Sequence, residues 1–409
     1  MTDLEQKPRL RFKGFTEAWE QRKLDQVASY RNGKAHENSI DSEGVYIVVN
    51  SKFVSTDGEV IKKSNEQIEP LFKNELAFVL SDVPNGRAIA RTFLVQKDGL
   101  YTLNQRIAGI TPSSDTCPYF LHILMNRNKY FLAFDDGAKQ TNLSVKDVLE
   151  FEANYPNFKE QERIGALFDS LDVLITLHQR KYEKLKSMKA ALLEKMFPSE
   201  NETTPKIRFK GFTEAWEQRK LSDLTSMHAR IGWQNLRTSE FLDSGNYMLI
   251  TGTDFNDGAI NFSTCHYVER ERYEQDRNIQ IHNGSILITK DGTLGKVAYV
   301  QGLSMPATLN AGVFNVQIKD ANNVDEKYLF QYLKAPFLMD YVDKKATGGT
   351  IKHLNQSILV DFPVILPQRS EQTLIGAFFQ QLDNLITLHQ RKCEKLKNLK
   401  KSLLERMFI

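Results

Sequence analysis

The stretch RFKGFTEAWEQRKL fills residues 11–24 and returns letter for letter at residues 208–221, an offset of 197. A second passage, LITLHQRK, stands at residues 174–181 and again at residues 385–392, an offset of 211. Repeats indicate architecture, because each copy is expected to build the same supersecondary unit. The chain is therefore predicted to follow one plan twice: a short lead-in, a long dissimilar block and a long helix.

Length and composition indicate an ordinary soluble protein with more than one core. The 409 residues suffice for two or three domains, and 41% of them are hydrophobic. No apolar run approaches the ~20 residues that span a membrane, and the start lacks the apolar stretch of a secretory signal. Three scattered cysteines fit a reducing compartment. The expected location is the cytoplasm.

Charge is distributed unevenly along the chain, although the net charge is only +3. Residues 25–160 carry 15 Lys and Arg against 18 Asp and Glu, and residues 222–371 carry 14 against 17. The two helical segments are basic, with 7 against 5 in 161–197 and 7 against 3 in 372–409. Phosphate binding usually requires a basic patch. If the middle blocks bind nucleic acid, their basic side chains must therefore gather on one face.

Both repeated helices carry apolar residues at alternating steps of four and three, which is the heptad seam of a coiled coil. No proline or interior glycine interrupts either run after the first turn. The 33 residues from Ile164 to Met196 would form a helix of ~50 Å. The predicted seam residues are Ile164, Phe168, Leu171, Ile175, His178 and Leu185 in the first helix, and Ile375, Phe379, Leu382, Ile386, His389 and Leu396 in the second.

The two helices are predicted to bury each other's apolar seams. Like units usually associate about a two-fold axis, which favours an antiparallel pair; the alternative is a parallel pair with both blocks at one end. Polar residues interrupt both seams at equivalent points, His178 with His389 and Lys189 with Lys400. A buried polar seam residue often sets register, and this structural role is favoured over a pH switch.

The middle blocks share a coarse pattern despite their different residues. Each contains short strand-like runs followed by a helix-like stretch, which indicates one α+β fold present twice with diverged loops. The change of offset places 14 extra residues in the second block, and residues 198–206 are typical of a flexible linker. The predicted strands are 45–49, 76–80, 88–93, 247–250, 285–289 and 297–300, and the predicted helices are 119–134 and 326–342.

Polar, glycine-containing turns at corresponding places are the best candidates for ligand contact. They are TKDGTLGK at 289–296 with SDVPNGR at 81–87, and GAKQTN at 137–142 with TGGTIK at 347–352. Glycine lets the backbone approach a phosphate and lysine neutralises it, although a plain hairpin loop is the alternative. The triplet NQR at 104–106 has side chains that pair with base edges. The candidate DNA-binding residues are Asn85, Arg87, Gln105, Arg106, Lys139, Thr141, Lys290, Thr293, Lys296, Thr350 and Lys352.

Sequence motifs of catalysis are absent. The chain has no P-loop, no GxGxxG, no GxSxG elbow and no Pro-Pro dipeptide, which an amino-methyltransferase motif would need. No CxxC pair or HExxH supports a zinc site. The sequence therefore predicts neither a catalytic residue nor a metal ligand.

Together these segments resemble the specificity subunit of type I restriction-modification systems, over essentially the whole chain. The resemblance rests on the lead-in ending WEQRKL and its copy, the Glu-Gln pairs at 160–161 and 371–372, and the two helices with LITLHQRK. The runs LNQRIAGI at 103–110 and KDGTLGKV at 290–297 are also similar to family members.

The resemblance implies a non-catalytic chain with two target-recognition domains, 25–160 and 222–371. Each would recognise half of a split DNA site through the major groove. The lead-ins at 1–24 and 198–221 and the helices at 161–197 and 372–409 would form the shared frame, with the helices antiparallel and setting the spacing. Two modification subunits, which bind S-adenosylmethionine and methylate adenine, would dock on them, and restriction subunits would supply ATP- and Mg-dependent chemistry. The alternatives are a self-contained nuclease or methyltransferase, and a coiled-coil protein-interaction scaffold without DNA readout.

Overall fold

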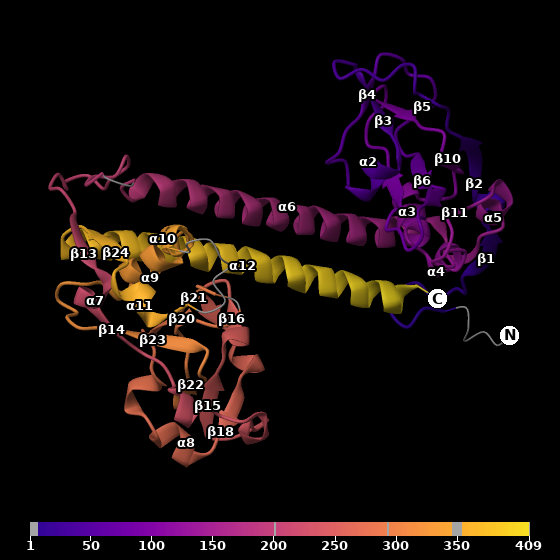
Figure 1. Ribbon diagram of the computed structural model, residues 1–409. Helices are drawn as coiled ribbons and strands as arrows, with labels where there is room; N and C mark the ends of the chain where they lie inside the picture. The colour runs from indigo at the N-terminus through magenta and orange to yellow at the C-terminus, as the bar shows by residue number, and fades with distance from the viewer. Residues whose placement is uncertain (1–6, 200–201, 293, 346–353, 409) are drawn as a thin grey trace. The chain divides into compact units, whose positions relative to one another are not determined.

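Two units of the same α+β fold make up the chain (Figure 1). The computed structural model describes residues 7–199, 202–292, 294–345 and 354–408. The first unit comprises Met1–Gln179 with Gln390–Ile409, and the second comprises Arg180–His389. Both units contain matching elements in the same order, so the predicted duplication of one α+β fold is confirmed.

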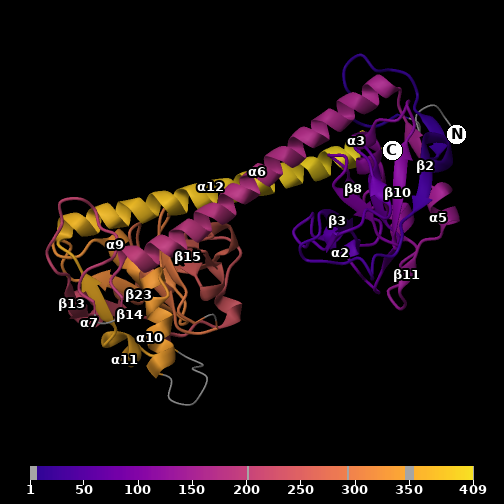
Figure 2. The same ribbon diagram turned by 90° about the horizontal axis from the view of Figure 1, so that it is seen from above.

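Four sheets occur in the described part of the first unit, and the shortest of them is a pair of two-residue strands. A lead-in strand pairs antiparallel with the strand that precedes the long helix, and two four-stranded sheets follow, the second of which contains one parallel pair, β3 with β9. The first pair is β1 (Glu20–Lys23) with β12 (Glu152–Tyr155). The antiparallel sheet, visible in Figure 2, has the order β2 (Ala28–Asn32), β10 (Ile107–Pro112), β6 (Leu76–Val79), β8 (Thr92–Leu94). The mixed sheet has the order β4 (Lys63–Ser64), β3 (Tyr46–Val49), β9 (Tyr101–Leu103), β5 (Pro70–Leu71).

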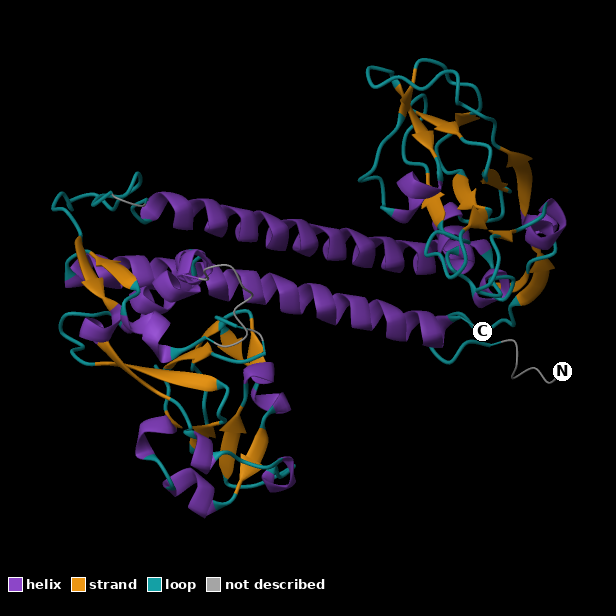
Figure 3. Cartoon of the chain, viewed as in Figure 1, coloured by secondary structure: helices purple, strands orange, loops and turns teal. Residues whose placement is uncertain are grey.

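The second unit repeats the lead-in pair and both four-stranded sheets with different residues, and Figure 3 shows strands and helices in both units. Its lead-in pair is β13 (Glu217–Lys220) with β24 (Pro363–Leu366). The antiparallel sheet has the order β14 (Thr225–His228), β23 (Val313–Ile318), β20 (Ile286–Thr289), β21 (Val297–Tyr299). The mixed sheet has the order β18 (His266–Val268), β15 (Tyr247–Ile250), β22 (Ala307–Leu309), β19 (Gln280–Ile281), with β15 and β22 parallel.

The two predicted helices of the middle blocks are each divided in two. In the first unit α3 (Pro118–Met125) ends before Arg127, whose φ of 57° is left-handed, and the Asn128 side chain caps α4 (Lys129–Leu132). In the second unit Pro336 separates α9 (Glu326–Lys334) from α10 (Phe337–Lys345). Proline has no N–H to continue a helix.

The predicted strand 88–93 is wrong over most of its length. The strand observed there is β8, which begins only at Thr92. The Asp82 carboxylate accepts hydrogen bonds from the N–H groups of Ala88 and Ile89, and Ala90 has a left-handed φ of 57°. These contacts fold the chain into a turn, and alternating apolar residues could not reveal them.

The long helices α6 (Phe158–Met196) and α12 (Arg369–Met407) each have 39 residues and pack antiparallel. In the first unit the Phe168 and Phe408 rings are 6.0 Å apart. In the second unit the Phe197 and Phe379 rings are 5.9 Å apart. In both cases the beginning of one helix meets the end of the other, so the antiparallel prediction is confirmed and the parallel alternative is wrong.

Burial along the predicted seam is greatest toward the helix starts. Ile164, Phe168 and Leu171 in α6 are at most 6% exposed, as are their counterparts Ile375, Phe379 and Leu382 in α12 and, further along α12, Ile386. The remaining predicted seam residues are partly buried, namely Ile175, His178, Leu185, His389 and Leu396. No helix in the described part of the chain combines the length and apolarity needed to cross a bilayer.

The repeated lead-in is clamped to the start of each long helix by a buried ion pair. The Arg11 guanidinium binds both Glu160 oxygens at 2.7 Å, and the Arg208 guanidinium binds both Glu371 oxygens at 2.8 Å. Both glutamates are fully buried. The identical lead-in sequences thus form the same bidentate ion pair in both units. The planar guanidinium of arginine matches the two oxygens of a carboxylate, which makes this geometry favourable.

Two glycines near the helix starts allow the block helices to approach closely. A Cβ at Gly376 would lie 2.7 Å from the Tyr328 backbone nitrogen, whereas one at Gly165 would meet the Cys117 Sγ at 3.2 Å. We expect Gly376→Ala to lower the free energy of unfolding by about 1–3 kcal/mol, because the backbone must shift. Gly165→Ala should cost less, since a side-chain sulfur can move and alanine favours the helix by about 1 kcal/mol. Thermal unfolding of both variants tests this order, and equal melting temperatures would contradict it.

Candidate nucleic-acid interface

Three segments of the first unit meet at the C-terminal end of β6: residues 81–87, 104–106 and 137–142. The Leu80 N–H donates to the Arg106 carbonyl at 3.1 Å, and the Leu143 N–H donates to the Leu80 carbonyl at 2.8 Å. Beyond Leu80, β7 (Ser81–Asp82) pairs antiparallel with β11 (Thr141–Asn142). The structure thus brings together the candidate segments of the first block at one edge of the domain.

The second unit forms the corresponding edge from corresponding segments. The Lys290 N–H donates to the Gly312 carbonyl at 2.9 Å, and the Leu354 N–H donates to the Lys290 carbonyl at 2.8 Å. The turn 289–296 therefore lies beside residues 310–312 and the chain at Leu354. Three candidates of the second block, Thr293, Thr350 and Lys352, lie outside the described residues.

Acidic side chains of the first edge are bound to the N–H groups of their own loops. Asp82 accepts from the backbone of Val83, Ala88 and Ile89, and Asp136 accepts from Ala138 and Lys139. The two backbone hydrogen bonds lower the pKa of the Asp136 carboxyl. These carboxylates are engaged in holding the loop conformation. The excess of Asp and Glu over Lys and Arg in this block therefore does not show that the edge itself repels a phosphate.

Basic candidates of the first edge are free to meet an external anion. Arg87, Arg106 and Lys139 are exposed, and none of them has an ion-pair partner among the residues that the structure describes. A cluster of three unpaired cations at one loop edge is the concentration of positive charge that phosphate binding needs.

The other candidates of this edge serve mainly to hold its loops together. The Asn85 Nδ2 donates to the Gly137 carbonyl at 3.2 Å, and the Gln105 Nε2 donates to a Glu37 oxygen at 3.1 Å. Thr141 is only 5% exposed, and its hydroxyl donates to Asp135 at 3.1 Å. Asn85 and Gln105 are exposed and could also meet a ligand, whereas Thr141 is a support of the loop.

On the second edge, a hydrogen bond joins the two ends of the turn 289–296. The Lys296 N–H donates to the Thr289 hydroxyl at 2.9 Å. Gly292 and Gly295 adopt left-handed φ angles of 74° and 68°, which a residue with a side chain rarely adopts. Lys296 is exposed, and the Lys290 ammonium lies 5.5 Å from the centre of the Phe314 ring. Lys296 and the left-handed glycines thus lie in one turn, and its contact with a ligand remains a prediction.

Two buried polar side chains that the sequence analysis missed support these edges. Arg230 is 1% exposed and donates to the Leu309 carbonyl and the Gln275 amide oxygen, each at 3.0 Å. Its burial lowers the pKa of the guanidinium. In the first unit His36, 2% exposed, hydrogen-bonds to the Thr102 hydroxyl at 2.8 Å. Arg230 thus binds β22, which leads into residues 310–312 of the second edge, and His36 binds β9, which leads into residues 104–106 of the first edge. A lone Arg or His gave no signal in sequence.

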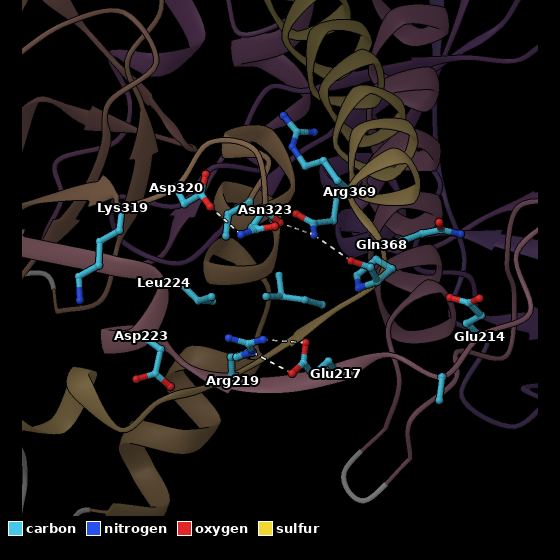
Figure 4. A pocket seen from close by; sticks show the side chains of 15 residues that line it. Glu214, Glu217, Arg219, Asp223, Leu224, Lys319, Asp320, Asn323, Gln368 and Arg369 are labelled. Carbon is cyan, nitrogen blue, oxygen red and sulfur yellow. Dashed lines mark hydrogen bonds and ion pairs between the residues drawn. The ribbon is translucent and has the colours of Figure 1, made fainter.

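A cleft of about 380 Å³ opens between the second lead-in and the start of α12 (Figure 4). Its lining mixes both signs of charge, and Arg219 pairs with Glu217 at 2.9 Å. Lys319, which lines the cleft, directly follows β23, whereas Gly312 of the candidate edge directly precedes that strand. The cleft and the candidate edge therefore lie at opposite ends of β23. A similar cleft beside Glu17 and Phe158 occurs in the first unit. No group of His, Cys, Asp and Glu able to hold a metal ion occurs among the described residues.

A duplicated α+β domain with a polar loop edge in each copy, joined to antiparallel long helices, defines the class of DNA specificity subunits. The family described as "Type I restriction modification DNA specificity domain" matches residues 16–187 and 213–398, and the chain belongs to this family. It is the DNA specificity subunit of a type I restriction-modification system, and subunits of this family are non-catalytic.

Specificity subunits of type I restriction enzymes are similar to this chain over most of its length. The type I restriction enzyme MjaVIII specificity subunit of Methanocaldococcus jannaschii is 21% identical over 401 residues, covering 95% of this chain and 91% of that one. The MjaIX specificity subunit of the same organism is 22% identical over 75% of this chain and 72% of its own. The crystal structure of the type I restriction-modification S subunit from M. genitalium superposes with a TM-score of 0.70 at 16% identity, covering 98% and 99% of the two chains. The expected fold is thereby confirmed.

Proposed function

We propose that the two loop edges recognise different halves of one asymmetric, bipartite DNA site. The observation that carries this proposal is that both edges are built from corresponding segments of one fold but present different side chains. The segment SDVPNGR of the first edge occupies the place of TKDGTLGK in the second. Direct contacts in the major groove distinguish all four base pairs. Unlike loops on a common scaffold would therefore select unlike half-sequences.

The frame would set the distance between the two halves. In this proposal residues 25–160 and 222–371 are the target-recognition domains, with lead-ins at 1–24 and 198–221 and spacing helices at 161–197 and 372–409. A helix of 39 residues is ~58 Å long. Half-sites one DNA turn apart are separated by ~34–36 Å, which a helix pair of that length can support.

Modification subunits would dock on an exposed apolar flank of the helix pair. In each unit at least three large apolar side chains of the long helices, each 40–46% exposed, lie outside the seam. In the heptad a to g, the seam residues are the a and d positions, and the residue just before each a position is a g position. The g positions of two antiparallel helices lie on the same flank of the pair. A residue three places after a g position lies on the same face of its helix. Exposed leucines at these places fit the apolar stripe of a partner helix, one partner for each unit. The residues are Leu174, Leu177 and Leu399 in the first unit, and Leu385, Leu388 and Met188 in the second.

Catalysis and its cofactors would belong to those partners. Adenine must leave the DNA stack to be methylated, and the modification subunit would hold the flipped base together with S-adenosylmethionine. Restriction subunits would supply the ATP- and Mg-dependent steps. The role of this chain, acting in the cytoplasm without a cofactor of its own, is to select where the complex binds.

Methylation-site sequencing of a cell carrying the chain and its partners would provide the site, and two matched lysine variants then test the edge. Lys139 lies on the first edge, whereas Lys97 follows β8 at the opposite end of the same sheet; both are exposed. We expect Lys139→Ala to weaken binding of the complex to the site several-fold and to reduce the slope of log affinity against log salt by about 1. Lys97→Ala should change neither quantity.

The outcomes separate the proposal from its alternatives. Equal effects of the two lysine variants would place the DNA elsewhere on the domain. Failure of the assembled complex to bind any bipartite duplex would favour a protein-interaction scaffold, and methyl transfer by the isolated chain would favour a self-contained methyltransferase.

A further inference from the structure

One aspartate in each long helix joins three elements of its unit. In the second unit the Asp383 carboxylate of α12 accepts from the Lys189 ammonium of α6 at 2.7 and 2.8 Å. The same carboxylate accepts from the Gln331 Nε2 of α9 at 2.8 Å. A single carboxylate thus binds the antiparallel helix on one side and the recognition domain on the other.

The first unit has the same junction at the equivalent place, an offset of 211 away. The Asp172 carboxylate of α6 accepts from the Lys400 ammonium of α12 at 2.6 and 2.7 Å. It also accepts from the Tyr119 hydroxyl of α3 at 2.8 Å. The aspartate and the lysine are the same in both junctions, whereas the donor from the recognition domain differs.

Both recognition domains donate a hydrogen bond to the equivalent aspartate, although they use different residues to do so. Helices α3 and α9 can be aligned by the residue that precedes each of them, because the N–H groups of Cys117 and Asp325 donate to the equivalent side chains of Gln161 and Gln372. Tyr119 lies two residues after Cys117, whereas Gln331 lies six residues after Asp325. Different side chains on different turns therefore reach the equivalent carboxylate.

The Lys189–Asp383 pair lies in a largely buried position, so its loss is costly, and its hydrogen bonds have a preferred direction. The side chains of Lys189 and Asp383 are only 9% and 18% exposed. Burial, together with the nearby Lys334 charge, lowers the pKa of Lys189 to about 8, although the Asp383 carboxylate opposes that change. Apolar contacts between α9 and α12 tolerate sliding, because they have no preferred direction. Hydrogen bonds to a carboxylate weaken steeply with angle, so the junction resists rotation of the domain on the helices.

We propose that Asp172 and Asp383 are positioning residues that fix the angle of each recognition domain on the helix pair, and through it the number of unread base pairs between the half-sites. The inference rests on the proposed function. One added base pair moves a half-site by ~3.4 Å and turns it by about one tenth of a helical turn. A domain held at one angle accepts one gap, and a domain free to turn accepts several.

The test measures gap selectivity in the complex with the modification subunits. Binding is compared for duplexes carrying the native gap and gaps one base pair shorter or longer. We expect the unmodified chain to prefer its own gap by about 100-fold. Asp383→Asn should reduce that preference to below about 10-fold while the affinity for the native gap changes only a few-fold. Asp361→Asn is the matched control, because Asp361 forms an exposed pair with Lys220 and should leave the preference unchanged.

A second variant covers the case in which Asp383→Asn fails to fold. Gln331→Leu removes the hydrogen bond from the recognition domain at 2.8 Å and keeps the Lys189–Asp383 pair, so that only the longer contact of the Lys334 ammonium, at 3.8 Å, still joins α9 to this carboxylate. It should reduce gap selectivity in the same way. Unchanged selectivity in a folded Asp383→Asn or Gln331→Leu complex would overturn the inference. Absence of any gap preference in the unmodified complex would instead overturn the proposed function.

Discussion

Replacing Arg208 by alanine is expected to lower the free energy of unfolding by about 3–5 kcal/mol. The Glu371 carboxylate is fully buried, and both of its oxygens accept from the Arg208 guanidinium at 2.8 Å. Without that guanidinium a carboxylate would remain buried with no opposite charge beside it. The cost is that of an uncompensated charge, which is why it exceeds the worth of an ordinary ion pair. Denaturant unfolding followed by circular dichroism measures the loss.

A matched control lies in the same lead-in. Arg219 binds Glu217 with similar geometry, but the two side chains are 49% and 65% exposed. Arg219→Ala should therefore cost less than about 1 kcal/mol. Arg11→Ala in the first unit should behave like Arg208→Ala, because Glu160 is equally buried. Similar small losses in all three variants would show that burial of the glutamate does not determine the effect.

The sequence predicted the architecture well because repeats and heptads are local patterns. The seam at Ile164, Phe168 and their copies follows from spacing alone, and it led correctly to two antiparallel helices. Lys189 and Lys400 were recognised as polar interruptions of that seam. Their partners were not, since Asp172 and Asp383 flank the seam, where exposed carboxylates are common.

The loop edges could be predicted only as separate turns. Pairing of β7 with β11 joins residues about sixty positions apart through backbone hydrogen bonds, which leave no mark in residue type. The break at Arg127 was missed for a similar reason, because a left-handed φ at arginine has no sequence signal comparable to glycine. Side chains such as Arg230, which bind carbonyl groups inside the domain, resemble any exposed arginine until the fold is known.

Acidification is expected to destabilise the first unit through His122. The His122 ring is partly buried, and its Nδ1 lies 2.8 Å from the Thr92 hydroxyl. Removal from solvent, together with the smaller effect of the Lys400 charge, lowers the pKa of His122 to about 4, although the Asp172 charge opposes the shift. An unfolded histidine has a pKa of about 6.5. Between these values only the unfolded chain binds the proton, so stability falls as the pH drops from about 6.5 to about 4, by about 2–3 kcal/mol in all.

The second unit supplies the variant that tests this. Phe120 and Tyr328 both pack against the tryptophan of their lead-in, and two residues further on α3 has His122 where α9 has Phe330. His122→Phe should flatten the dependence of melting temperature on pH between 7 and 4, while the exposed His282, replaced in the same way, should leave it unchanged. Carboxylates elsewhere contribute equally to all three chains, so the difference between slopes isolates this one group. A His122→Phe chain that loses stability with acid as steeply as the original would show that the ring accepts its proton without cost in the folded unit.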